Sequence, residues 1–154
     1  MIEFLIVGED REPGAPFEKR LRTLSRELRI EEVVRFFGFD ADLPGTLAAV
    51  DAVAVPSWNE AFSLVTAEAM AAGRAVVASR AGALEELVSD GETGLLVPPR
   101  DPEALASAIL RLASDPALAD RLGRAARASS GRFARGPGVD RVVALYERLM
   151  AEAG

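Results

Sequence analysis

The sequence predicts a doubly wound α/β fold, in which helices cover both faces of a parallel sheet. Short apolar segments alternate with helical segments along most of the 154-residue chain. The apolar segments are uniformly apolar rather than alternating, which is typical of strands buried on both faces. Ligands bind such folds beyond the carboxyl ends of the strands, so the loops after the strands are the first candidates for a site.

Five segments are expected to be strands: Glu3 to Gly8, Val33 to Phe39, Asp51 to Ser57, Arg74 to Ser79 and Leu95 to Pro98. The first helix is expected between Phe17 and Ile30, where leucines recur at helical spacing. A glycine stops a helix from Leu64 to Ala72, and a proline starts one from Pro102 to Ser114. The remaining helical segments are Asp42 to Val50, a turn within Ala83 to Gly94, Ala117 to about Ser129, and Val139 to Ala153.

Composition excludes several kinds of chemistry. The chain is 49% hydrophobic, as in a globular protein, and it contains no cysteine and no histidine. Thiolate catalysis and zinc-thiolate sites are therefore excluded, and the commonest general base is absent. A net charge of −6 argues against nucleic acid as a partner. No apolar run is long enough to span a bilayer and no signal peptide is recognisable, so a cytoplasmic location is expected.

The segment "PSWNEAFSLVTAEAMAAG" places two glutamates, Glu60 and Glu68, around an expected helix start near Ser63. The first N–H groups of a helix lack partners within the helix and form a ready site for phosphate. If every intervening residue were helical, the two glutamates would lie about 12 Å apart, beyond the roughly 5 to 10 Å of a glycosidase pair. The spacing suits a long ligand with an anionic middle, such as a nucleotide-sugar.

Two simpler interpretations remain open at this point. Ser57 and Glu60 have the spacing of a capping box for a helix that starts at Trp58. Glu68 is equally compatible with a position that merely faces solvent.

The wider segment from Val55 to Ile109 closely resembles the C-terminal domain of the retaining, nucleotide-sugar-dependent glycosyltransferases of group 1 (family 4). Their signature is Glu, seven residues, Glu, and then Ala-Met-Ala-x-Gly, which matches Glu60, Glu68 and Ala69 to Gly73. "VVRFFGF", "DAVAVPS" and "SDGETGLLVPPRDPEAL" resemble further segments of the family, so the resemblance extends along the whole chain. It implies the GT-B architecture of two Rossmann-like domains.

The resemblance implies a role for each element of the site. Glu60 contacts hydroxyls of the donor sugar and is a weaker candidate for the catalyst, and Glu68 holds the ribose. The sugar and diphosphate lie against backbone amides of Phe62, Ser63 and Leu64. The base lies near Phe37, Gly38 and Phe39, although the two phenylalanines are also expected in the core. Gly82 and Glu86 match a less certain second loop, and Glu86 also fits a surface position.

Several departures from the family pattern affect these expectations. Ser63 and Ala83 stand where the family usually has glycine, and Ser63 can either donate to phosphate or cap the helix. The family's first strand and the Arg and Lys that grip the diphosphate are not found, and neither is the N-terminal acceptor domain. We therefore expect residues 1–154 to be one Rossmann-like donor-binding domain, inactive alone. Arg80 or Arg100 is a candidate substitute cation.

In the Rossmann order 3-2-1-4-5-6 the first strand is central, so its loss leaves a gap or exposes strand edges. We expect the neighbouring strands to close up or another chain to provide cover, for example in a homo-oligomer. An arginine-rich segment from Arg121 to Arg141 fits an anionic membrane, but a solvated helix face is the favoured interpretation. The full-length enzyme is then cytoplasmic or peripheral to the inner face of the membrane.

Three hypotheses follow for function. The first is the donor-binding half of a glycosyltransferase that transfers a hexose to a hydroxyl acceptor. It uses a nucleotide-sugar as substrate and no metal or other cofactor. The second is a non-catalytic module that binds a nucleotide or nucleotide-sugar, and the third is an inactive fragment.

Overall fold

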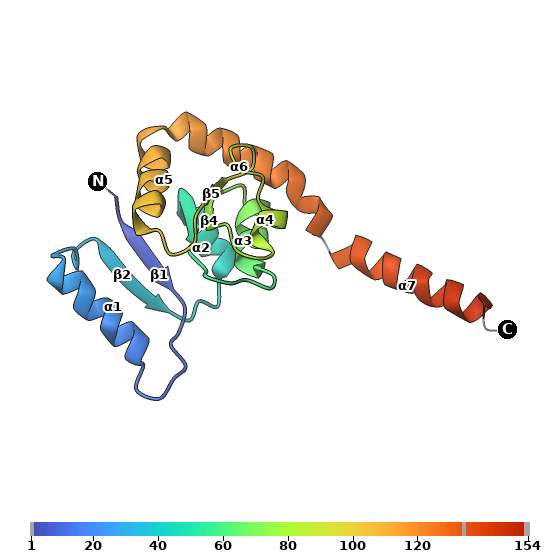
Figure 1. Ribbon diagram of the computed structural model, residues 1–154, viewed down its shortest axis with the longest axis horizontal. Helices are drawn as coiled ribbons and strands as arrows, with labels where there is room; N and C mark the ends of the chain where they lie inside the picture. The colour runs from blue at the N-terminus through green and yellow to red at the C-terminus, as the bar shows by residue number, and fades with distance from the viewer. Residues whose placement is uncertain (1, 134, 153–154) are drawn as a thin grey trace. The chain divides into compact units, whose positions relative to one another are not determined.

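The computed structural model describes residues 2–133 and 135–152, and its elements follow the predicted order (Figure 1). The strands are β1 (Phe4–Val7), β2 (Val34–Gly38), β3 (Ala52–Val55), β4 (Ala75–Ser79) and β5 (Leu95–Val97). The helices are α1 (Pro16–Glu27), α2 (Leu43–Ala49), α3 (Leu64–Ala71), α4 (Leu84–Leu87), α5 (Pro102–Ser114), α6 (Pro116–Ser130) and α7 (Arg135–Glu152), with a 3-10 turn at Gly131–Phe133. The chain forms two compact units, Met1–Thr46 and Leu47–Gly154.

In the first unit, β1 and β2 form a parallel pair that is joined through α1. Arg22 of α1 lies over the ring of Phe36 in β2, with its guanidinium carbon 4.2 Å from the ring centre. Asp10 accepts hydrogen bonds from the N–H groups of Phe17 and Glu18 at 2.7 and 3.2 Å, and so caps the start of α1. Of the residues described in this unit, Ser25 is the one that is fully buried.

The second unit has a three-stranded parallel sheet in the order β3-β4-β5. All five residues of β4 are buried, as the uniformly apolar sequence predicts for a central strand. One face of β4 contributes Ala75 and Val77 to a core shared with β5, α5 and α6. The sheets are parallel with helices on both sides, which confirms the predicted doubly wound α/β class.

The five strands do not form one continuous sheet. Among the described residues β1 pairs with β2 alone and β3 pairs with β4 alone, so each sheet lies within one unit. The expectation that neighbouring strands close up, or that another chain covers them, stays a prediction. A homo-oligomer formed through these edges stays a prediction.

The last helix starts earlier than the sequence suggested. The sequence predicted a helix from Val139, but α7 begins at Arg135. Pro137 falls in the first turn, where a helix needs no N–H from that residue. Ala153, the predicted last residue, lies outside the described residues. None of the described helices has both the length and the apolar composition that crossing a bilayer requires.

Candidate functional site

The loop after β3 carries the first of the two glutamates. This loop contains no helix at Trp58, so the capping-box interpretation is wrong. Instead, the hydroxyl of Ser57 donates to Oε2 of Glu60 at 3.2 Å. Glu60 is half-buried, and this bond holds its carboxylate within the loop.

The start of α3 lies at Leu64, as predicted, with Ser63 as its N-cap. The hydroxyl of Ser63 accepts from the N–H of Thr66 at 3.4 Å and from the Thr66 hydroxyl at 2.9 Å, so capping is what this buried side chain does. Within the described part of the chain, the N–H groups of Phe62, Ser63, Leu64 and Val65 donate no hydrogen bond. They form the positive end of the helix dipole.

Glu68 follows one turn inside α3. Its side chain is exposed and makes no hydrogen bond or ion pair with the described residues. The solvent-facing interpretation of this side chain therefore agrees with the structure. An exposed carboxylate one turn beyond four free N–H groups is also open to a ligand.

The loop after β4 is held directly against Glu60. The carbonyl oxygen of Glu60 accepts from the N–H of Ala83 at 3.0 Å. Gly82 has a φ of +55°, and a Cβ at this residue would come within 2.2 Å of the same oxygen. Glycine is therefore required at position 82, where the two loops are in direct contact. Glu86 lies on α4 and is exposed, as the surface interpretation expected.

The segment predicted to lie near the base belongs to the first unit. Phe37 and Phe39 are 57% and 63% exposed, so the expectation that they are core residues is wrong. Between them, Gly38 has a φ of +66° and accepts a hydrogen bond from the N–H of Gly8 through its carbonyl.

The two candidate cations have other partners. Arg80 forms an ion pair with Asp90, whose second oxygen accepts from the N–H of Leu96 at 2.9 Å. Arg100 lies over the ring of Trp58, with its guanidinium carbon 4.5 Å from the ring centre. Sequence reasoning assigned no role to Trp58, although a tryptophan in the loop directly after a strand was a visible signal.

No group of three or more histidine, cysteine, aspartate or glutamate side chains lies close enough to hold a metal ion in the part of the chain that the structure describes. The candidate site therefore consists of backbone N–H groups, two carboxylates and the loop glycine.

Comparisons with known proteins identify the family of the chain. The family model described as "Glycosyl transferases group 1" matches residues 1–115. The D-inositol 3-phosphate glycosyltransferase of Saccharomonospora viridis is 40% identical over 149 residues, which cover 96% of this chain and 35% of the relative. That of Corynebacterium jeikeium is 38% identical over 94% of this chain and 35% of the relative. The chain thus spans about a third of the length of these relatives.

Solved structures with the same fold include sucrose-phosphate synthase from Thermosynechococcus elongatus, with a TM-score of 0.86 and 37% identity. That match covers 96% of this chain and 38% of the synthase. Anabaena Alr3699/HepE in complex with UDP-glucose has a TM-score of 0.87 and 31% identity, over 97% of this chain and 41% of the neighbour. With a family model that matches most of its length, the chain belongs to the group 1 glycosyltransferase family.

Proposed function

We propose that this chain is the donor-binding part of a retaining glycosyltransferase, which transfers a hexose from a nucleoside diphosphate sugar to a hydroxyl acceptor. One observation carries the proposal: free N–H groups at the start of α3 are flanked by Glu60 before the helix and Glu68 within it. The complexes of the Anabaena neighbour with UDP and UDP-glucose support a uridine nucleotide and a hexose.

Each group has a defined task in this proposal. The N–H groups of Phe62, Ser63 and Leu64, together with the helix dipole, stabilise the negative charge of the diphosphate and the sugar beside it. The carboxylate of Glu60 accepts hydrogen bonds from sugar hydroxyls, and that of Glu68 accepts them from the ribose hydroxyls. The segment Phe37 to Phe39 lies near the base.

Transfer with retention then proceeds on one face of the sugar. The bond between the anomeric carbon and the phosphate oxygen breaks, and a bond from that carbon to the acceptor oxygen forms on the same side. The acceptor's proton passes to the departing phosphate, so no side-chain base is needed. Glu60 orients the sugar and is the weaker candidate for a catalyst. We expect neither a metal nor another cofactor in this reaction.

The chain alone is proposed to bind donor without turnover. Arg80 is held by Asp90, and Arg100 lies on Trp58. Arg100 lines a pocket that includes none of residues 60–68, and Arg80 is paired, so we propose neither as a replacement for the family's diphosphate-binding pair. An acceptor domain must come from outside these residues. A cytoplasmic location, at the inner face of the membrane for the full-length enzyme, stays a prediction.

Calorimetry with UDP, GDP and ADP, each with and without an attached sugar, tests the proposal. We expect one nucleotide to bind the wild-type chain, and Glu68→Ala to weaken it at least tenfold, since a hydrogen bond to a charged group contributes about 1.5 to 3 kcal/mol. Glu92→Ala is the matched control, because Glu92 is an exposed glutamate before β5, at the opposite edge of the sheet.

The outcomes separate the alternatives. If no nucleotide binds, the chain is an inactive fragment. Binding that survives Glu68→Ala contradicts the ribose assignment, and turnover by the chain alone contradicts its proposed incompleteness.

A further inference from the structure

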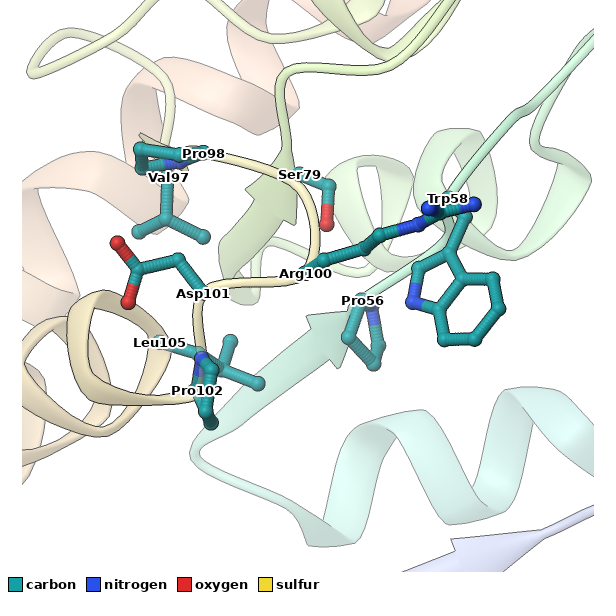
Figure 2. A pocket seen from close by; sticks show the side chains of 9 residues that line it. All are labelled: Pro56, Trp58, Ser79, Val97, Pro98, Arg100, Asp101, Pro102 and Leu105. Carbon is teal, nitrogen blue, oxygen red and sulfur yellow. The ribbon is translucent and has the colours of Figure 1, made fainter.

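A pocket of about 320 Å³ lies within the second unit (Figure 2), and its lining includes none of the proposed donor-site residues. All three strands of this unit end at it: Pro56 directly follows β3, and Ser79 and Val97 are the last residues of β4 and β5. The start of α5 closes another side. The carboxyl edge of a parallel sheet is where α/β proteins place ligands. Its lining residues are Pro56, Trp58, Ser79, Val97, Pro98, Arg100, Asp101, Pro102 and Leu105.

One end of the pocket is aromatic and cationic. The indole of Trp58 is 68% exposed even though the guanidinium of Arg100 lies over it. Arg100 makes no ion pair with the described residues, and its φ of +61° is one that side-chain-bearing residues rarely adopt. Arg100 is therefore a cation without an anionic partner among the described residues, and it lies on an exposed aromatic ring. Such a guanidinium can bind an anionic group of a ligand.

The other end presents polar groups to the pocket. Ser79 is 2% exposed, and its hydroxyl makes no hydrogen bond with the described part of the chain. Figure 2 shows this hydroxyl pointing into the pocket, where it is open to a ligand. Oδ1 of Asp101 accepts from the N–H of Ala104 at 2.9 Å, which leaves Oδ2 free to accept from a ligand hydroxyl. Figure 2 places this carboxylate across the pocket from Trp58.

We propose that this pocket is a second small-molecule site, and that it binds a single sugar ring bearing an anionic group. The anionic group faces Arg100, the apolar face of the ring lies on Trp58 and Pro56, and ring hydroxyls bond Ser79 and Asp101. The volume is at the lower end of the roughly 300 to 1,000 Å³ typical of ligand pockets, which suits one ring rather than a whole nucleotide-sugar.

The proposal does not rest on donor binding at α3. The pocket nevertheless shares a loop with Glu60. In this loop Trp58 lies between Ser57 and Glu60, whose side chains are hydrogen-bonded to each other. Binding at Trp58 is therefore expected to shift the N–H resonances of Ser57 and Glu60 as well.

The chain carries its own probe of this site, because Trp58 is its single tryptophan. We would titrate the wild-type chain with glucose 6-phosphate, mannose 6-phosphate, glucose 1-phosphate and glucuronate, and with glucose and inorganic phosphate alone, while recording tryptophan fluorescence. At least one of the anionic sugars is expected to bind with one-to-one saturation, at least tenfold more tightly than either glucose or phosphate.

Matched variants locate the binding. Arg100→Gln and Ser79→Ala should each weaken it about tenfold or more. Arg111→Gln, which removes an exposed arginine near the end of α5, should leave it unchanged. Trp58→Ala, followed by calorimetry, should abolish it. Circular dichroism confirms that each variant is folded.

Three results would overturn the proposal. No saturable binding across the panel excludes an anionic-sugar site, and equal binding of inorganic phosphate reduces it to an anion site. Loss of sugar binding in Glu68→Ala assigns the ligand to the donor site instead. Binding of an anionic sugar without any nucleotide binding would support this site while rejecting the proposed donor function.

Discussion

The two units differ in how completely they bury their own apolar residues. In Leu47–Gly154, β4 is buried from end to end, and a cluster of apolar side chains packs between β4, β5, α5 and α6. In Met1–Thr46, no described apolar side chain is fully buried, and Phe4, Leu5 and Val7 of β1 are all exposed. The second unit therefore has an apolar core that can stabilise it. The described residues of the first unit form helix and strands but no buried apolar core.

This contrast follows from the number of neighbours that each strand has. β4 lies between two strands and packs against helices α3, α5 and α6. Among the described residues, β1 pairs with one strand only. A two-stranded sheet is marginal in water unless other elements cover it. Substitutions in each unit test this difference in apolar burial.

The largest effect is expected from Leu122→Ala in α6, because Leu122 is fully buried at 0% exposure. Truncation should lower the free energy of unfolding of the second unit by about 2 to 5 kcal/mol, through lost burial and a residual cavity. Leu24→Ala, at a residue of the first unit that is 46% exposed, should cost less than about 1 kcal/mol. Urea unfolding followed by Trp58 fluorescence, which reports the second unit, and by circular dichroism measures both. Equal losses would contradict the contrast.

A smaller effect is expected from the close packing of α6. A Cβ at Gly123 would come within 2.2 Å of the carbonyl oxygen of Gly73 and within 3.4 Å of the N–H nitrogen of Ala75. Gly123→Ala should therefore destabilise the second unit by about 1 to 3 kcal/mol, although alanine favours helix.

Gly131→Ala at the end of the same helix is the matched control, since nothing lies within 4 Å and its φ is −55°. It should be neutral or stabilising by up to about 1 kcal/mol. If both substitutions behaved alike in urea unfolding, α6 would not be packed as closely as described.

The Ser63 cap of α3, in the second unit, should contribute less to stability. Ser63→Ala removes the cap of α3 and leaves the buried Thr66 hydroxyl without an acceptor, which should cost about 0.5 to 2 kcal/mol. In Ser63→Ala/Thr66→Val neither hydroxyl remains unpaired, so the loss should be smaller than the sum of the single losses. Additive losses in a double-mutant cycle would argue against the bond between the two hydroxyls.

The smallest effect concerns the surface cap of the first unit. Desolvation raises the pKa of the Asp10 carboxyl, but hydrogen bonds from the N–H groups of Glu12, Glu18 and Phe17 together hold that pKa below its ordinary value. Because the pKa of Asp10 is lower in the folded state, its ionised carboxylate stabilises the fold at pH values above the pKa of an unfolded aspartate. This contribution is lost as the pH falls through the lowered pKa.

Carbon NMR of the Asp10 carboxyl should therefore give a midpoint below the unperturbed value of about 3.9. The N–H groups of Phe17 and Glu18 should change their chemical shifts with the same midpoint. In Asp10→Asn this pH dependence should disappear. A midpoint at or above the ordinary value would show that the loop does not cap α1 in solution.

The sequence predicted the elements and their class well, because buried parallel strands and capped helices leave local patterns. The bounds of α5 and the start of α3 were correct to the residue, since Pro102 and Ser63 mark them. Failures occurred where one local pattern fits two structures, or where burial depends on elements that the local pattern does not include. The Ser57 and Glu60 spacing fits a capping box, yet no helix starts at Trp58. Phe37 and Phe39 have core-like composition, but no described element of their unit buries them.

The site shows the same division. Spacing and the family resemblance made Glu60 and Glu68 candidates, and the predicted helix start between them is confirmed, because these residues are close in sequence. The contact of Gly82 with Glu60 joins residues 22 positions apart and depends on how β3 and β4 align, so local patterns do not reveal it. The pairing of Trp58 with Arg100 joins two loops in the same way.

The bond from the Ala83 N–H to the Glu60 carbonyl gives the proposed donor site a built-in reporter. A ligand that pulls on the Glu60 carboxylate also moves its backbone, and the Ala83 amide resonance should move with it. That resonance lies on a different strand connection from every group proposed to touch the diphosphate. A shift of the Ala83 amide resonance would distinguish a ligand that binds the Glu60 carboxylate from one that contacts only the start of α3. Neither ligand needs to carry a label.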